Sequence, residues 1–332
     1  MNIEPISNIN LYGLERYFKE CASLYDSNKL PNKILFSGKK GLGKSTLAYH
    51  IINYVCSQNE DNKYDRNNNI INVENKSFKL IQNGTHPNFY LIDIFEGKKN
   101  IDIEQIRAMI AHTNKSNFND KPRFILIDNI ENLNKNSINA LLKIVEEPKK
   151  NLFFILIHNN QTKILPTLIS RCLTFNINLN FNEVVSISNK ITKKNIFEIL
   201  NENLINHYSS PGQIVRLINY SNEKKIDLKR INFLGRLEHT ETISEIKKSY
   251  ILLHPSKEES FGNIYLEAMS CGTPIIAGKF SGATAEVIKS HGLLVDVNNI
   301  NQIANAITKY FKHQTFYNSI RYSAYSYVFN NF

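Results

Sequence analysis

The chain has 332 residues, of which 42% are hydrophobic, so it can bury a sizeable core and is not a disordered polypeptide. Its length predicts about two domains. The longest apolar runs are far shorter than the roughly 20 residues of a membrane-spanning helix, and the first ten residues contain no apolar signal-peptide stretch. We therefore expect a cytoplasmic protein with no membrane span. The four cysteines, Cys21, Cys56, Cys172 and Cys271, are too far apart in sequence to suggest a disulfide framework or a zinc module.

The net charge of +10 is concentrated in the first 230 residues. Residues 231–332 hold 9 Lys and Arg against 8 Asp and Glu, so nearly all of the excess precedes them. A basic excess confined to one part suggests that this part meets a polyanion such as nucleic acid. The chain is also rich in Asn, Lys and Ile, which AT-rich codons specify, so genome composition is an alternative source of the charge.

Strands and helices are predicted to alternate along the first part of the chain. Apolar runs predict strands over residues 33–37, 89–94, 123–128 and 152–158. Helical spacing and breakers predict helices from residue 45 to about 55, over 103–112, and over 136–147 with a stop at Pro148. This alternation predicts an α/β fold in which helices cover both faces of a parallel sheet.

Residues 38–45 match the pattern G-x-x-x-x-G-K-S between a predicted strand and a predicted helix, which is the context of a phosphate-binding P-loop. Glycines let backbone N–H groups surround a phosphate, and the helix start adds partial positive charge. The lysine can reach the β and γ phosphates. We expect ATP and Mg²⁺ to bind here. The predicted binding residues are Gly38, Gly41, Gly43, Lys44, Ser45, Thr46 and Asp128, with Ser45 and Asp128 as the metal ligands.

Asp128 ends the strand RFILID and suits the role of a second magnesium ligand. A glutamate that orients the attacking water usually comes next, but this chain has Asn129, which is neutral and a poor base. We therefore expect nucleotide binding with weak or no hydrolysis. The structural alternatives are a glycine-rich turn without a ligand and an aspartate that only caps a turn.

Residues 1–222 resemble the delta-prime subunit family of bacterial DNA polymerase III clamp loaders, which are AAA+ proteins. The segments that carry the resemblance are GKKGLGKST (38–46), HPNFYLID (86–93), IRAMI (106–110), FILIDNIENLNKNSINALLKIVEEP (124–148) and LPTLISRC (165–172). The resemblance implies an AAA+ P-loop domain over 1–175 and a small helical lid over 176–222. It implies other clamp-loader subunits and the polymerase III holoenzyme as partners, with primer-template DNA contacted indirectly.

The resemblance also implies roles for single residues. Arg171 lies in the SRC motif, whose arginine completes the ATP site of the neighbouring subunit; a helix-end arginine paired with a carboxylate is the alternative. Asn159 or Asn160 would lie near the sensor position. Residues 209–212 resemble the turn that opens the last lid helix, where Gln213 replaces a frequent arginine.

The resemblance stops near residue 223, where a helical collar domain is expected and does not follow. Residues 223–230 are short, polar and charged, and they indicate a linker or seam. Beyond them, strands are predicted over 231–235, 250–256 and 274–278, and helices over 242–249 and 262–270.

Residues 231–332 resemble the C-terminal, donor-binding part of retaining GT-B glycosyltransferases of group 1. The motif is Glu259-x7-Glu267 within PSKEESFGNIYLEAMSCGTPII. The resemblance implies a UDP- or GDP-sugar ligand. Phe261, Gly262 and Asn263 would hold the donor phosphate through backbone N–H groups. Glu259 would be a catalytic residue that bonds the sugar, and Glu267 would bond the ribose. The alternative is a pair of surface charges on an amphipathic helix.

The resemblance implies that this second part is a partial, Rossmann-like GT-B half-domain, because the acceptor-binding domain expected in that family does not precede it. Without that domain no closed cleft can exclude water, so we expect no sugar transfer by this chain alone. A strand-poor sheet would also leave an unpaired apolar edge. The chain is thus either a genuine fusion or an accidental join of two reading frames. Its main function is expected to be that of a clamp-loader subunit, and glycosyl transfer is the alternative.

Overall fold

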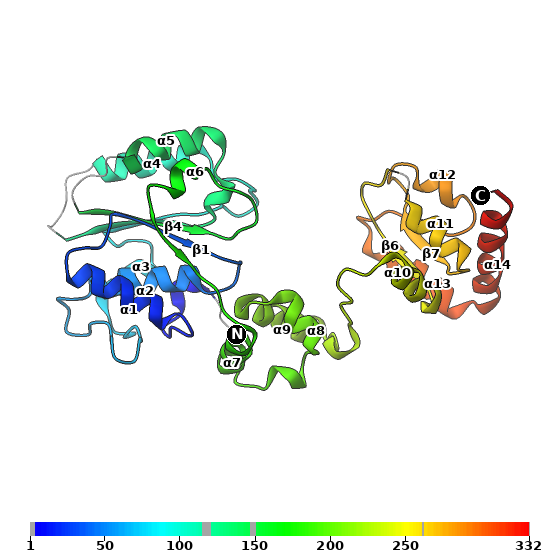
Figure 1. The fold of residues 1–332 in the computed structure, drawn as a ribbon, viewed down its shortest axis with the longest axis horizontal. Helices are drawn as coiled ribbons and strands as arrows, with labels where there is room; N and C mark the ends of the chain where they lie inside the picture. Colours follow the sequence, from blue (N-terminus) through cyan, green and yellow to red (C-terminus); the bar gives the residue numbers. More distant parts are fainter. Residues whose placement is uncertain (1–3, 115–120, 147–150, 261, 332) are drawn as a thin grey trace. The chain divides into compact units, whose positions relative to one another are not determined.

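The computed structural model describes residues 4–114, 121–146, 151–260 and 262–331. The chain divides into two compact units, Met1–Phe233 and Leu234–Phe332, which Figure 1 shows in sequence colours. Each unit has its own sheet and its own hydrophobic core, so each is described by itself.

The first unit begins with an α/β domain. Its helices are α1 (Glu15–Asp26), α2 (Lys44–Cys56), α3 (Lys76–Gln82), α4 (Ile103–Asn114), α5 (Lys135–Glu146) and α6 (Pro166–Ile169). Its strands are β1 (Lys33–Ser37), β2 (Phe89–Ile92), β3 (Arg123–Ile127), β4 (Leu152–His158) and β5 (Leu173–Asn176). The predicted strands and helices are confirmed, with β2 two residues shorter than expected. Glu147 and the predicted stop at Pro148 lie outside the described residues.

The five strands form one parallel sheet in the order β2-β3-β4-β1-β5. Helices α1, α2 and α3 lie on one face, and α4, α5 and α6 lie on the other (Figure 1). Because the strands are parallel, their carboxyl ends all meet at one edge of the sheet, where α/β folds place their ligands. The expected parallel α/β architecture is therefore present.

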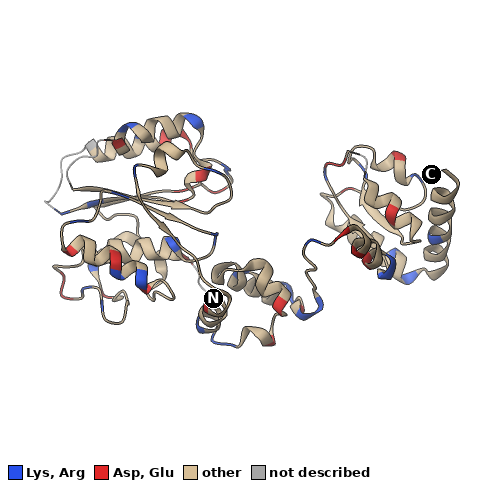
Figure 2. Cartoon of the chain, in the orientation of Figure 1, with Lys and Arg blue, Asp and Glu red and all other residues tan. Residues whose placement is uncertain are grey.

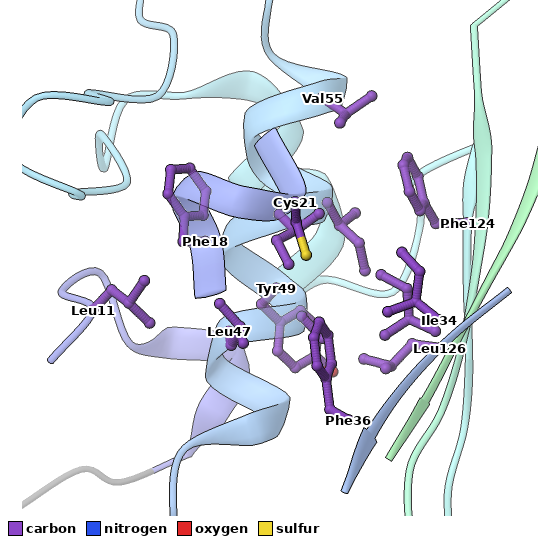
Figure 3. Close-up of a cluster of buried hydrophobic side chains, with 14 of the residues drawn as sticks. Leu11, Phe18, Cys21, Ile34, Phe36, Leu47, Tyr49, Val55, Phe124 and Leu126 are labelled. Carbon is purple, nitrogen blue, oxygen red and sulfur yellow. The ribbon is translucent and has the colours of Figure 1, made fainter. Parts of the chain in front are cut away.

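Both faces of the sheet are buried, which explains the near-continuous apolar strands. On one face, Ile34 and Phe36 of β1 and Phe124 and Leu126 of β3 pack against α1 and α2, as Figure 3 shows. The alternate residues of the same strands pack against α4 and α5 in a second cluster. Charged side chains lie mainly on helices and loops, and the strands carry them only at their first positions, Lys33 and Arg123 (Figure 2).

Three helices complete the first unit as a small helical bundle. They are α7 (Phe181–Thr192), α8 (Glu202–Tyr208) and α9 (Pro211–Lys224), followed by a 3-10 turn at Leu228–Arg230. Their apolar faces share one core, which includes Val184, Leu204 and Ile214 and also Leu228 from the turn. Asn180 caps α7 in a reciprocal capping box with Glu183.

The predicted strand over 231–235 is absent, because its first residues pack on this bundle instead. Asn201 donates through Nδ2 to the carbonyl oxygen of Ile231 at 2.7 Å. The ring of Phe233 stacks on His207, with centroids 4.2 Å apart. An extended segment needs a neighbouring strand to become part of a sheet, and here its polar and aromatic groups find partners on α8.

The second unit is a smaller α/β domain. Its elements are α10 (His239–Lys248), β6 (Leu252–His254), α11 (Asn263–Ser270), β7 (Ile275–Gly278), α12 (Thr284–Ile288), β8 (Leu293–Val295), α13 (Ile300–Lys312) and α14 (Gln314–Asn331). The strands are parallel in the order β6-β7-β8. Ile275 and Ala277 of β7 pack against α10, α11 and α12, and Ile276 packs against α13.

The strand β6 forms one edge of this three-stranded sheet, and the predicted run 250–256 is a strand only over its three central residues. Leu253 is 41% exposed there. The unpaired apolar edge that the sequence predicted is therefore confirmed. Within the described parts of both units, no helix has the length and apolar character needed to cross a membrane.

Candidate functional site

The P-loop lies where the sequence places it, between the end of β1 and the start of α2. Gly38 follows the strand directly, and Gly43 in the left-handed conformation precedes the helix. Gly41 has a φ of +88°, and a Cβ there would lie 2.6 Å from Ser210 Oγ. Glycine is the residue that adopts this backbone conformation without strain.

Lys44 is the first residue of α2 and is 3% exposed. Its Nζ donates to the carbonyl oxygens of Gly38 and Lys39, both at 2.7 Å. Burial lowers the pKa of Lys44 to about 8, although the nearby charges of Asp128 and Glu131 oppose this shift. The ammonium is thus held by two backbone carbonyl oxygens of the loop.

Ser45 and Asp128 come together although they are far apart in sequence. Ser45 Oγ donates to Asp128 Oδ2 at 2.6 Å. Burial raises the pKa of the Asp128 carboxyl, with the Ser45 hydrogen bond acting against it. The neighbouring Thr46 is buried in the first turn of α2. The two predicted metal ligands therefore present a hydroxyl and a carboxylate oxygen at one point, the ligand chemistry that Mg²⁺ prefers.

A hydrogen-bonded series of polar residues follows Asp128 along the carboxyl edge of the sheet. Asn129 has a left-handed backbone with a φ of +57°, and its Nδ2 donates to Asp93 Oδ1 at 2.6 Å. Its Oδ1 accepts from Asn159 Nδ2 at 2.8 Å. The backbone N–H of Asn159 in turn donates to the Glu131 carboxylate at 3.2 Å. These residues end or follow β2, β3 and β4, so the parallel topology brings them together.

Two residues of this hydrogen-bonded series, Asp93 and Glu131, were not predicted from the sequence. Asp93 ends the apolar run FYLID just as Asp128 ends RFILID, so the same pattern could have identified it. The other sensor candidate, Asn160, accepts instead from Ser37 Oγ at 2.8 Å. Asn159 is therefore the one that contacts Asn129.

The start of α9 closes over the P-loop from the helical bundle. The Gly212 amide donates to the Gly41 carbonyl oxygen at 2.9 Å. Ser210 Oγ donates to the carbonyl oxygen of Lys40 at 2.8 Å, and Lys39 Nζ donates to Ser209 Oγ at 2.8 Å. The turn 209–212 predicted to open this helix is thus also the part of the bundle that contacts the loop.

Arg171 follows the short helix α6 in the chain. Its Nη2 is 3.0 Å from Glu146 Oε1, and its Nη1 donates to the carbonyl oxygen of Thr167 at 2.7 Å. The Arg171 side chain is 37% exposed. The guanidinium is therefore paired with a carboxylate within the chain while one part of it faces solvent.

In the second unit, Glu259 precedes α11 and Glu267 lies within this helix. Gly262 caps the helix with a φ of +76°, and a Cβ there would lie 2.4 Å from the Tyr265 ring. Asn263 is the first helical residue, whereas Phe261 lies outside the described residues. Glu259 Oε1 accepts from the Ser260 amide at 3.1 Å. Glu267 Oε1 is 3.1 Å from His239 Nε2 of α10.

Two family models match the chain in two different segments. The model described as DNA polymerase III, delta subunit, matches residues 13–181, about half of the chain. The model described as glycosyl transferases group 1 matches residues 216–327. The second match begins inside α9, so its first residues belong to the helical bundle of the first unit.

Individual relatives carry the names of the first family. A DNA polymerase III subunit delta' from Buchnera aphidicola (subsp. Baizongia pistaciae) is 28% identical over 239 residues, which cover 70% of this chain and 63% of that protein. The Pseudomonas aeruginosa delta' subunit is 30% identical over 139 residues, which cover 42% of this chain and 40% of that protein. A Buchnera gamma subunit is 31% identical over 182 residues, or 53% and 46% of the two chains.

The chain spans less than two thirds of the length of the first two of these relatives. The delta-subunit match covers the P-loop, the Ser45–Asp128 contact and Arg171, and the glycosyltransferase match covers the second unit almost entirely. The chain therefore belongs to the DNA polymerase III, delta subunit family, and it has a chimeric architecture in which a segment similar to glycosyl transferases group 1 follows.

Proposed function

We propose that the first unit binds Mg-ATP as part of a DNA polymerase III clamp loader. The observation that carries the proposal is the 2.6 Å contact between Ser45 Oγ and Asp128 Oδ2 beside a P-loop with a buried lysine. Gly38, Gly41 and Gly43 let the loop amides surround the β phosphate, and Lys44 neutralises charge on the β and γ phosphates. Ser45 and Asp128 would hold Mg²⁺, which bridges the phosphates and offsets their charge.

Hydrolysis is weak or absent in this proposal, because the residue after Asp128 is an amide. Asn129 cannot take a proton from water, and both ends of its side chain are engaged, by Asp93 and by Asn159. The unit thus keeps the groups that bind a triphosphate and lacks the usual base that destroys it.

Arg171 acts in trans in this proposal, at the ATP site of a neighbouring clamp-loader subunit. The guanidinium is a permanently charged planar fork that can neutralise the γ phosphate of a bound nucleotide. Its partner Glu146 is half exposed, so the pair is weak and can open. The partners are the other clamp-loader subunits and the polymerase III holoenzyme, and primer-template DNA is contacted indirectly. The relatives named as delta' and gamma subunits support this assignment.

Titration of the full chain with fluorescent ATP tests the binding proposal. We expect Lys44→Ala to weaken ATP binding by at least about tenfold, because it removes a buried charge aimed at phosphate. Lys63→Ala, at an exposed lysine between α2 and α3, is the matched control and should bind as the unsubstituted chain does. Equal affinities of Lys44→Ala and Lys63→Ala would refute the P-loop assignment.

Reconstitution with the other loader subunits tests the trans role. We expect Arg171→Ala to lower the ATPase rate of the assembled loader while ATP binding by this chain is unchanged. Arg107→Ala, at an exposed arginine of α4 that pairs with Glu104, is the control for loss of a surface cation. An unchanged loader ATPase rate with Arg171→Ala would remove the role.

Glycosyl transfer is the second candidate function, and the match over residues 216–327 is the observation that favours it. In this case Glu259 would bond the sugar, and Gly262 and Asn263 would present amides to the donor phosphate. Glu267 lies 3.1 Å from His239, and the described residues of the unit form one three-stranded sheet. We therefore expect no transfer from a UDP- or GDP-sugar. Detectable transfer that Glu259→Ala abolishes would establish this second function.

A further inference from the structure

The edge of the sheet beside the P-loop holds a carboxylate that the binding proposal does not use. Asp93 follows β2, the strand next to β3, so its side chain lies beside Asp128 and Asn129. Asp93 Oδ1 accepts two hydrogen bonds, one from Asn129 Nδ2 at 2.6 Å and one from the backbone N–H of Ile94 at 2.7 Å. Among the described residues, none donates a hydrogen bond to its Oδ2.

The charge of Asp93 reaches the metal-binding residues. Burial is the main cause that raises the pKa of the Asp128 carboxyl, and the charge of Asp93 raises it further. Asp93 is only partly buried, so part of this residue is open to water. Asn129 fixes the orientation of the carboxylate and is itself fixed by Asn159, so Oδ2 has a defined direction.

Glu131 is the other carboxylate near this edge, and its contacts give it a structural task. Both of its oxygens accept the backbone N–H of Asn159, at 3.2 and 3.3 Å. It therefore holds the segment after β4 in place. Asp93 keeps one oxygen for a ligand, whereas the two Glu131 oxygens share a backbone donor.

We propose that Asp93 is the general base of a slow ATP hydrolysis. From the end of the neighbouring strand, its carboxylate takes the place of the glutamate that is missing at position 129. This inference rests on the proposed binding of Mg-ATP. Asp93 Oδ2 accepts a hydrogen bond from the attacking water and takes its proton. The water oxygen forms a bond to Pγ while the bond from Pγ to the β–γ bridging oxygen breaks, and ADP leaves with the electron pair. Inorganic phosphate forms, and Asp93 returns the proton to solvent.

The test compares variants of the full chain in three measurements: phosphate release from Mg-ATP, the affinity for fluorescent ATP, and the affinity for ADP with aluminium fluoride, which mimics the transferred phosphoryl group with its attacking water. Asp93→Asn should lower phosphate release by about 10²-fold, the scale of a lost general base. It should weaken the ADP–aluminium fluoride complex by about tenfold and leave ATP affinity within about twofold. Glu96→Gln, at an exposed carboxylate of the same loop, should change none of these.

Other results separate the two proposals. Unchanged phosphate release with Asp93→Asn, or ATP bound by the original chain without any release above buffer, would overturn the role of Asp93 and leave the binding proposal standing. A larger effect with Glu131→Gln would overturn it too. Absence of ATP binding by the original chain would instead overturn the binding proposal itself. If Asp93→Asn melts at a lower temperature, Asp93→Ser, whose hydroxyl can still accept from Asn129, serves in its place with the same expected results.

Discussion

The backbone amide of Gly212 donates a 2.9 Å hydrogen bond to the carbonyl oxygen of Gly41, so the first turn of α9 touches the centre of the P-loop. The two glycines approach so closely that a Cβ on Gly212 would lie 2.9 Å from that oxygen and 3.0 Å from the Gly41 Cα. The helical bundle therefore helps to define the conformation of the loop.

We predict that Gly212→Ala disturbs both the fold and the site. The added methyl group meets backbone, which cannot move aside as a flexible side chain can, and overpacking of this kind costs about 1–3 kcal/mol. The free energy of unfolding should fall by that amount, and ATP affinity should fall with it. Asn222→Ala, at an exposed position of the same helix, is the control. Urea unfolding and ATP titration give both values; full ATP affinity in Gly212→Ala would contradict the coupling.

ATP affinity should depend on pH through Lys44. Burial lowers the pKa of Lys44 to about 8, whereas an unfolded lysine titrates near ~10.4. Between these values the unfolded chain binds more protons, so this group makes the free protein more stable as pH rises through that window. ATP needs the charged amine, so affinity should fall between about pH 7 and about pH 9. Lys44→Ala should remove this dependence; an unchanged slope in that variant would assign the titration to another group.

The pair between Glu146 and Arg171 should add little to stability. Both side chains are substantially exposed, at 50% and 37%, and exposed pairs contribute ~0–1 kcal/mol. Glu146→Gln should therefore lower the free energy of unfolding by less than ~1 kcal/mol in urea unfolding. Glu104→Gln, which removes the exposed pair with Arg107, is the matched comparison. A clearly larger loss for Glu146→Gln would show that Arg171 is held too firmly to turn toward another subunit.

Residues 231–233 should behave as part of the helical bundle. Phe233→Ala removes the stack on His207, an aromatic pair of the kind that contributes about 0.5–1.5 kcal/mol beyond burial. Amide hydrogen exchange in α8 should then become faster in the full chain. Leu234→Ala changes the next side chain, which is 52% exposed, and should leave α8 exchange unaltered. Equal exchange in both variants would mean that the stack is unimportant.

Much of the first unit could be predicted from sequence because its local patterns agree with its packing. Nearly all residues of the runs RFILI and LFFILIH are apolar, so both faces of these strands are apolar. Helices cover both faces of the sheet. The P-loop could be located because its glycines, lysine and serine act within one short segment. The contact of Ser45 with Asp128 was expected because the second metal ligand of a P-loop lies at the end of a nearby parallel strand, although β4 separates β1 from β3.

The features that the sequence did not predict involve groups whose partners lie far away along the polypeptide. The segment INFLG has strand-forming residues, but Asn201, the N-cap of α8, and His207 within α8 contact its first three residues. Asp93 was overlooked because its relation to Asn129 depends on β2 lying beside β3, which periodicity does not reveal. The sequence does not reveal that Glu146 is the partner of Arg171, because Glu146 ends α5 and Arg171 follows α6.

Because residues 231–233 pack against the helical bundle, they do not extend the sheet of the second unit. Among the described residues, no strand pairs with the outer side of β6, and Leu253 is exposed there. An open strand edge of this kind can pair with another polypeptide. At high protein concentration, this half of the molecule is where self-association and precipitation should begin, and a charged residue at position 253 is the simplest way to improve its solubility.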